Sequence, residues 1–160
     1  IGLAKPSDEA FVADLHRRID AKGLGDRFHF TGVLPLDRLR SEILPALSLV
    51  VNVARYEPFG VVPIEGMAAG TPFVCSDTGH YRAFSDGGRT GLIVQTEDAD
   101  ATAAAVGGLL SNPDRIEHMG RAARKKAVAD HSIAREADGA AEVYERLWAG
   151  EDLAVHRPPL

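Results

Sequence analysis

This sequence of 160 residues has very little cysteine, because Cys75 is the only one. A single cysteine cannot form an intrachain disulfide, and Cys75 lies in an apolar stretch, so we expect a buried thiol in a reducing compartment. Six histidines are present, but they do not recur at the spacings that metal ligands have in a sequence. We therefore predict that the chain has no metal site.

A long apolar run and an excess of basic residues are also missing. No apolar run reaches the ~18 residues that a helix needs to cross a bilayer. The sequence has 18 Lys and Arg residues against 23 Asp and Glu residues, a net charge of −5, which argues against non-specific binding to nucleic acids. The length suits one domain, which we place at residues 1–150, followed by a tail at 151–160.

The centre of the sequence has the pattern of a strand, a helix and a second strand. The apolar run 47–53 predicts the first strand, and residues 61–69 predict a short helix with Pro63 in its first turn and Gly70 just beyond its end. The second strand is predicted at 72–75. Such a unit needs a crossover connection between two parallel strands.

Helical patterns also occur on both sides of this unit. Apolar spacing predicts helices at 8–22 and at 36–47, the latter broken or ended by Pro45, and three more from residue 98 onward. The predicted first residues or caps of these helices are Ser7, Asp98, Asn112 and Ser132. In the last helix an apolar stripe runs from Ile133 to Leu147, with Trp148 beside its end.

Two further strands complete the predicted fold. Phe28 and Phe30 alternate with polar residues and predict a short strand, and residues 91–94 predict another. Ile1-Gly2 has the character of a strand end. The order βαβαβαβ with a helical tail predicts an α/β domain, a doubly wound (Rossmann-like) parallel sheet with helices on both faces.

The loop and helix after the first central strand have the composition of a binding site. Glu57 lies on the loop at the carboxyl edge of the predicted sheet, where open α/β folds bind ligands. The amides of Gly60, Val61 and Val62 would be free donors in the first turn of the helix, and they suit a phosphate or a sugar hydroxyl. Helical side chains lean toward the amino terminus, so Glu65 can reach the same ligand. Carboxylates only accept hydrogen bonds, which fits sugar hydroxyls.

Four short motifs in this region together resemble a known family. They are Glu57-Pro58-Phe59-Gly60, then Glu65, then Gly70-Thr71-Pro72, and Ser76-Asp77-Thr78-Gly79. This combination resembles the carboxy-terminal half of the retaining, nucleotide-sugar-dependent glycosyltransferases of family four, which have the GT-B fold. Members of that family often carry a second glycine where this sequence has His80.

The resemblance implies a role for each matched residue. It implies that Glu57 lies at the donor sugar as the candidate catalytic residue and that Glu65 holds the nucleotide ribose. It implies that the backbone of Phe59, Gly60, Val61, Val62 and Gly79 contacts the sugar and the diphosphate. The main chain of Gly32 and Val33 would meet the base.

The activity implied by the resemblance is hexosyl transfer with retention from a nucleoside diphosphate sugar, such as GDP-mannose or UDP-glucose, to an acceptor hydroxyl. No cofactor is implied. The sequence of residues 56–82 resembles that of envelope and lipopolysaccharide mannosyltransferases. This resemblance implies a cytoplasmic protein, peripheral to the inner face of the membrane. The basic run at 115–126 is either a contact with an anionic membrane or, as we prefer, a solvated helix face.

The family pattern also implies that this chain is a fragment. We expect that the first βαβ segment of the donor domain, with its arginine and lysine, and the acceptor-binding amino-terminal domain are missing. The missing strands would stand beside the strand at 47–53, so we expect the fragment to close the gap directly or to self-associate through exposed sheet edges. Alone, it should bind nucleotide weakly and be inactive.

Two alternatives come from other classes. A non-catalytic doubly wound nucleotide-binding or interaction module would have the same periodicity, but it would need clustered acidic residues at a strand end or a phosphate-binding loop. A GT-B epimerase or phosphorylase would share the layout, but a glycogen-type phosphorylase needs a pyridoxal-bearing lysine, and the sequence indicates none near Glu57.

Overall fold

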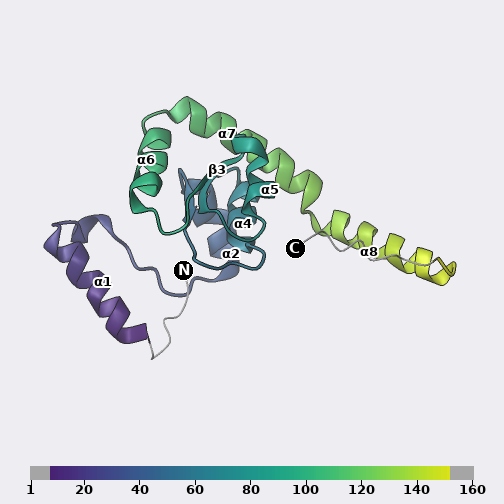
Figure 1. Cartoon of the computed structure of the whole chain (residues 1–160), viewed down its shortest axis with the longest axis horizontal. Helices are drawn as coiled ribbons and strands as arrows, with labels where there is room; N and C mark the ends of the chain where they lie inside the picture. Colours follow the sequence, from purple (N-terminus) through teal and green to yellow (C-terminus); the bar gives the residue numbers. More distant parts are fainter. Residues whose placement is uncertain (1–7, 152–160) are drawn as a thin grey trace. The chain divides into compact units, whose positions relative to one another are not determined.

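The computed structural model describes residues 8–151 of the chain (Figure 1). The chain divides into two compact units, residues up to 43 and residues from 44 onward. The predicted strand end at Ile1-Gly2, the predicted cap Ser7 and all but the first residue of the predicted tail lie outside the described residues.

The first unit is helical. It contains α1 (Glu9–Ala21), a 3-10 turn η2 (Gly25–Arg27), α2 (Leu36–Arg38) and a π-helical turn η3 (Leu39–Ile43). The helical conformation continues as α3 (Leu44–Ala46) and ends one residue after Pro45, close to the predicted position. The π turn precedes Pro45, which has no N–H to donate to a carbonyl one turn earlier.

The predicted strand at 28–30 is wrong. Phe28 has extended backbone angles, but no strand forms at these residues, and the side chains of Phe28 and Phe30 are 49% and 53% exposed. Phe30 instead packs on His16 of α1, with ring centres 4.3 Å apart. Alternating apolar residues form a strand only where a neighbouring strand supplies hydrogen bonds, and none does so in the described part of the chain.

The second unit is built on a parallel sheet of three strands in its described residues. These are β1 (Val50–Asn52), β2 (Phe73–Ser76) and β3 (Gly91–Val94), in the spatial order β1-β2-β3. Val51 is in register with Val74, and Val74 with Leu92. The central βαβ unit and the strand at 91–94 are therefore confirmed, with three strands in place of the four predicted.

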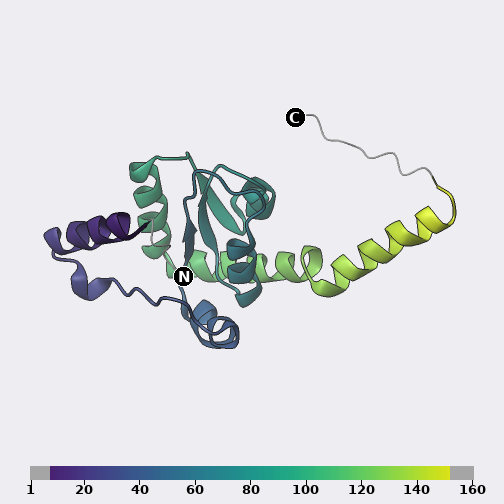
Figure 2. The same ribbon diagram turned by 90° about the horizontal axis from the view of Figure 1, so that it is seen from below.

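Helices cover both faces of this sheet (Figure 2). On one face, Val74 and Val94 form a buried cluster with Leu109 of α6 (Ala99–Leu110) and Met119 of α7 (Pro113–Asp130). On the other face lies α4 (Val61–Ala69), where a Cβ added to Gly66 would be 2.7 Å from Val50. The doubly wound arrangement is thus confirmed, and β2 is its completely buried central strand.

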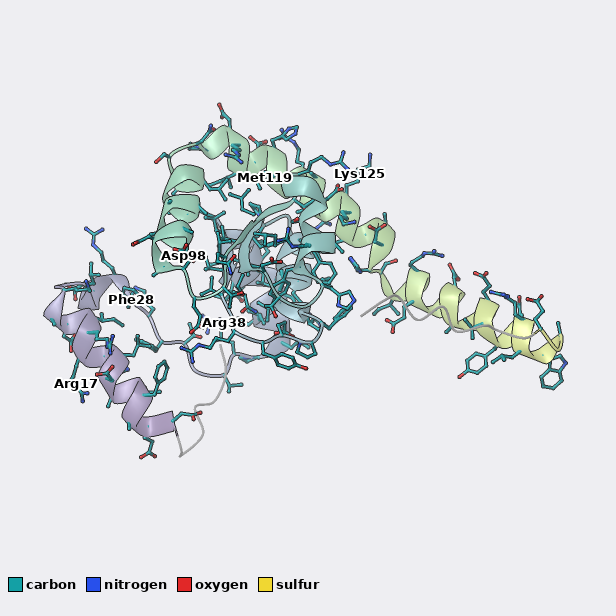
Figure 3. The ribbon with its side chains drawn as sticks, in the orientation of Figure 1. Arg17, Phe28, Arg38, Asp98, Met119 and Lys125 are labelled. Carbon is teal, nitrogen blue, oxygen red and sulfur yellow. The ribbon has the colours of Figure 1, made fainter. Side chains whose placement is uncertain are left out.

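Three helix starts are confirmed in atomic detail. Asp98 Oδ1 accepts a hydrogen bond from the Ala101 amide at 2.8 Å at the start of α6, where Figure 3 labels Asp98. Asn112 caps α7, with Pro113 as its first residue, and Ser132 caps α8 (Ile133–Trp148). The predicted apolar stripe of α8 is present, but its side chains are not buried against other described residues, and Trp148 is 94% exposed.

Two further findings concern the Cys75 thiol and the apolar character of the described helices. The Cys75 thiol is fully buried, as predicted. None of the described helices combines the length and the apolar character required to cross a membrane.

Candidate functional site

Two loops meet at the carboxyl edge of the sheet. The loop at 53–60 leaves β1, and the loop at 77–80 leaves β2. A Cβ added to Gly79 would lie 2.2 Å from the carbonyl oxygen of Glu57, so the two backbones touch at this point. The Ser76 hydroxyl also donates a hydrogen bond to the Ala54 carbonyl at 2.6 Å. The structure therefore brings Glu57 and Gly79 together at one edge.

The start of α4 lies at the same junction. Gly60 is the N-cap residue with φ +100°, and no side chain caps the helix. A Cβ on Gly60 would lie 2.1 Å from the Tyr81 ring, so the backbone rests directly on that ring. Val61 and Val62 follow on the surface. The first-turn amides carry the positive end of the helix dipole and have no side-chain acceptor.

Glu57 is half-buried beside this turn. Its Oε1 accepts a hydrogen bond of 3.4 Å from the Phe59 amide, which is long for such a bond. The negative charge of Glu57 also acts on two buried neighbours, Cys75 and Tyr81. Burial, together with this charge, raises the pKa of Cys75 to about 12, although a hydrogen bond with the Asn52 backbone opposes the shift. The thiol is therefore neutral at physiological pH and is no nucleophile.

Glu65 lies one turn into α4 and is half-buried. Residues three and four apart share a helix face, so Glu65 lies on the face of Val61 and Val62, the exposed residues of the first turn. This placement is compatible with a ligand that spans the first turn. That Glu65 and Glu57 reach one ligand stays a prediction.

Gly32 and Val33 belong to the first unit. Gly32 has φ +59° and Val33 is exposed. Their predicted contact with a nucleotide base stays a prediction.

The sequence did not indicate the short helix α5 (Tyr81–Ser85), whose side chains pack against Phe59 and Gly60 at the start of α4. Its Phe84 is buried and packs edge-on against Phe59, with ring centres 5.7 Å apart. His80, at the position of the expected second glycine, packs on Phe59 at 5.5 Å. Five residues are too few to show helical periodicity, and the aromatic spacing of Tyr81 and Phe84 was the one available signal.

The chemistry of the site is that of an anion and hydroxyl binder. It combines uncapped helix amides with a half-buried carboxylate on the neighbouring loop. Among residues 8–151, no three His, Cys, Asp or Glu side chains are grouped so that they could hold a metal ion. A groove of about 500 Å³ flanks the first turn, between Phe59, Val61 and Ile64 and the residues around the α7–α8 joint.

Comparison with known proteins gives the family. A family model described as Glycosyl transferases group 1 matches residues 1–126. The alpha-maltose-1-phosphate synthase of Mycolicibacterium smegmatis is 36% identical over 123 residues, which cover 73% of this chain and 32% of that protein. The lipopolysaccharide core biosynthesis mannosyltransferase LpsB of Rhizobium meliloti is 34% identical over 151 residues, which cover 91% of this chain and 41% of that protein.

The fold has close counterparts among solved structures. Anabaena HepE in complex with UDP-glucose superposes with a TM-score of 0.81 at 22% identity, covering 90% of this chain and 39% of that one. The chain thus spans about a third to two fifths of the length of these relatives. Because the family model covers most of its residues, the chain belongs to the group 1 glycosyltransferases, and its fold is that of the carboxy-terminal domain of GT-B enzymes.

Proposed function

We propose that this chain is the donor-binding part of a glycosyltransferase that moves a sugar from a nucleoside diphosphate sugar to an acceptor hydroxyl with retention. The observation that carries the proposal is the uncapped start of α4, placed against a loop that holds the Glu57 carboxylate. Residues 1–150 form the donor-binding domain in this proposal. An amino-terminal acceptor domain would complete the enzyme, so the chain alone would be inactive.

Each part of the donor has a proposed partner. The amides from Phe59 to Val62 and the Gly79 backbone bind the diphosphate and the sugar, and Glu65 accepts hydrogen bonds from the ribose. The amides would stabilise the leaving diphosphate without a metal or another cofactor. Glu57 would orient the donor sugar through its hydroxyls, and Gly32 and Val33 would meet the base.

GDP-mannose and UDP-glucose are the proposed donors. LpsB is a mannosyltransferase of lipopolysaccharide core synthesis and aligns with 91% of the chain, which favours GDP-mannose and envelope glycan synthesis. The HepE complex with UDP-glucose supports the second donor. An enzyme of this kind would work in the cytoplasm, at the inner face of the membrane. Contact with that membrane and self-association through the β1 edge remain parts of the proposal.

Titration calorimetry with each donor tests the proposal. Glu57→Gln and Glu65→Gln should each weaken donor binding by ~10-fold or more, because a hydrogen bond to a charged group contributes about 1.5–3 kcal/mol. Glu117→Gln on α7, an exposed glutamate paired with Arg121, is the matched control and should bind as the unaltered chain does. Donor binding that both site variants leave unchanged would contradict the proposal.

The same titration distinguishes the proposed function from a second candidate, a non-catalytic nucleotide-binding module. Such a module would bind UDP and UDP-glucose equally, because it has no use for the sugar. A donor-binding domain should prefer the nucleotide sugar, and Glu57→Gln should remove that preference.

A further inference from the structure

Tyr81 forms the floor of the turn that leads into α4. Its side chain is fully buried, and its ring occupies the space where a side chain at residue 60 would otherwise point. The contact is close, since a Cβ on Gly60 would lie 2.1 Å from the ring. Packing alone would be served equally well by phenylalanine, so the hydroxyl of Tyr81 requires its own explanation.

That hydroxyl is buried without a hydrogen-bond partner among the described residues. An unsatisfied buried hydroxyl costs about 1–3 kcal/mol, and native proteins retain few such groups. The Glu57 carboxylate lies near enough to act on the phenol both through its charge and through a hydrogen-bonding approach. That approach falls short of a well-formed hydrogen bond. Among the described residues, the one hydrogen bond of good enough geometry to the Glu57 carboxylate is the long bond from the Phe59 amide. Two neighbouring groups of complementary chemistry thus lack a strong bond to each other.

We propose that Tyr81 is a positioning residue for Glu57: when a donor binds, the Tyr81 hydroxyl donates to one carboxylate oxygen and leaves the other to accept from a sugar hydroxyl. This inference rests on the proposed function. A carboxylate has enough lone pairs to accept both hydrogen bonds. A hydrogen bond from a hydroxyl to an ionised oxygen is short and strong. Burial, with the nearby Cys75 and Glu57, raises the pKa of the Tyr81 phenol, so it remains a donor throughout the physiological range.

Tyr81→Phe separates this role from packing. The variant keeps the ring under Gly60 and removes the unsatisfied oxygen, so its melting temperature should be equal to or above that of the unaltered chain. Its affinity for GDP-mannose or UDP-glucose in calorimetry should fall by ~10-fold. Tyr144→Phe, at an exposed position on α8, is the matched control and should change neither quantity.

A double-variant cycle with Glu57→Gln tests whether the two residues act together. If they do, adding Tyr81→Phe to Glu57→Gln should weaken donor binding by less than Tyr81→Phe does alone. The proposal is overturned if Tyr81→Phe binds the donor as tightly as the unaltered chain, or if stability and affinity fall together.

A measurement without ligand keeps this inference separable from the proposed function. In a chain labelled with carbon-13 at the tyrosine Cζ, Glu57→Gln should shift the Tyr81 resonance and leave that of Tyr144 unchanged. If the chemical shift of Tyr81 is the same in Glu57→Gln as in the unaltered chain, the link between the two residues is overturned. If the shift occurs but neither donor binds, the link stands while the proposed function and the donor role both fail.

Discussion

The helices of the second unit begin in two different ways. At the starts of α6, α7 and α8, the side chains of Asp98, Asn112 and Ser132 accept hydrogen bonds from backbone amides at 2.8–3.2 Å. At the start of α4 no side chain does so, and Gly60 stands at the cap position. A side-chain cap stabilises a helix by about 1 kcal/mol, so α4 lacks a stabilisation that three helices of the same unit have.

The two ends of α4 show that this is a local feature and no general weakness of the helix. At its carboxyl end, Gly70 adopts a left-handed conformation and the Thr71 amide donates to the Gly66 carbonyl at 2.8 Å. Arg124 of α7 donates to the Ala68 carbonyl at 2.6 Å and complements the negative end of the dipole. Only the end beside Glu57 lacks a partner from a side chain, which is the end where we propose that the donor binds.

Gly60→Ala should have the largest effect on the uncapped start of α4. A methyl group there would collide with the buried Tyr81 ring, and the φ of +100° is unfavourable for alanine. Left-handed backbone and overpacking each cost about 1–3 kcal/mol, so the free energy of unfolding should fall by roughly 2–5 kcal/mol. Urea denaturation followed by circular dichroism measures this change, and donor binding should be lost with it.

Gly107→Ala on α6 is the control for that substitution. Nothing lies within 4 Å of the added Cβ, and the backbone is already helical. Alanine should therefore stabilise the chain by about 0.5–1 kcal/mol. If Gly60→Ala were as mild as Gly107→Ala, the close support of the α4 turn by Tyr81 would be refuted.

A smaller effect is expected from removing a cap where one exists. Asp98→Ala should lower the free energy of unfolding by about 1 kcal/mol, because the Ala101 amide loses its acceptor. Donor affinity should be unaffected, since α6 lies on the face of the sheet opposite α4. Calorimetric titration of this variant with GDP-mannose checks the second point. A loss of affinity would mean that helix caps in general, rather than the start of α4, determine binding.

The sequence predicted the second unit well because its local signals agree with its tertiary contacts. Pro63 and Gly70 bracket α4 as expected, and the polar residues at 98, 112 and 132 begin helices as their chemistry dictates. In the site, the loops of Glu57 and Gly79 each follow the carboxyl end of a predicted parallel strand, and this order correctly indicated that they share an edge.

The remaining features depend on contacts that sequence patterns do not encode. Phe28 and Phe30 alternate as in a strand, but pairing requires a neighbour, and alternation carries no information about one. Tyr81 lies in a five-residue helix, and its importance follows from its closeness to Gly60, twenty-one residues away. A buried hydroxyl without a partner is visible only in three dimensions.

The smallest expected effect concerns the joint between the capped helices α7 and α8. His131 packs edge-on against Phe84, which supports the Phe59 loop, and burial lowers its pKa below 6.5, although Asp130 opposes the shift. The unfolded chain therefore binds a proton more readily than the folded one, so the free energy of unfolding is largest above pH 6.5 and falls as pH drops below it.

Thermal unfolding between pH 5 and 8 should show a weaker pH dependence for His131→Phe, which keeps an aromatic ring against Phe84. Trp148→Phe, an aromatic substitution at an exposed position on α8, removes no titratable group and should keep the original dependence. If His131→Phe has an unchanged pH profile, His131 is not held neutral by its burial against Phe84.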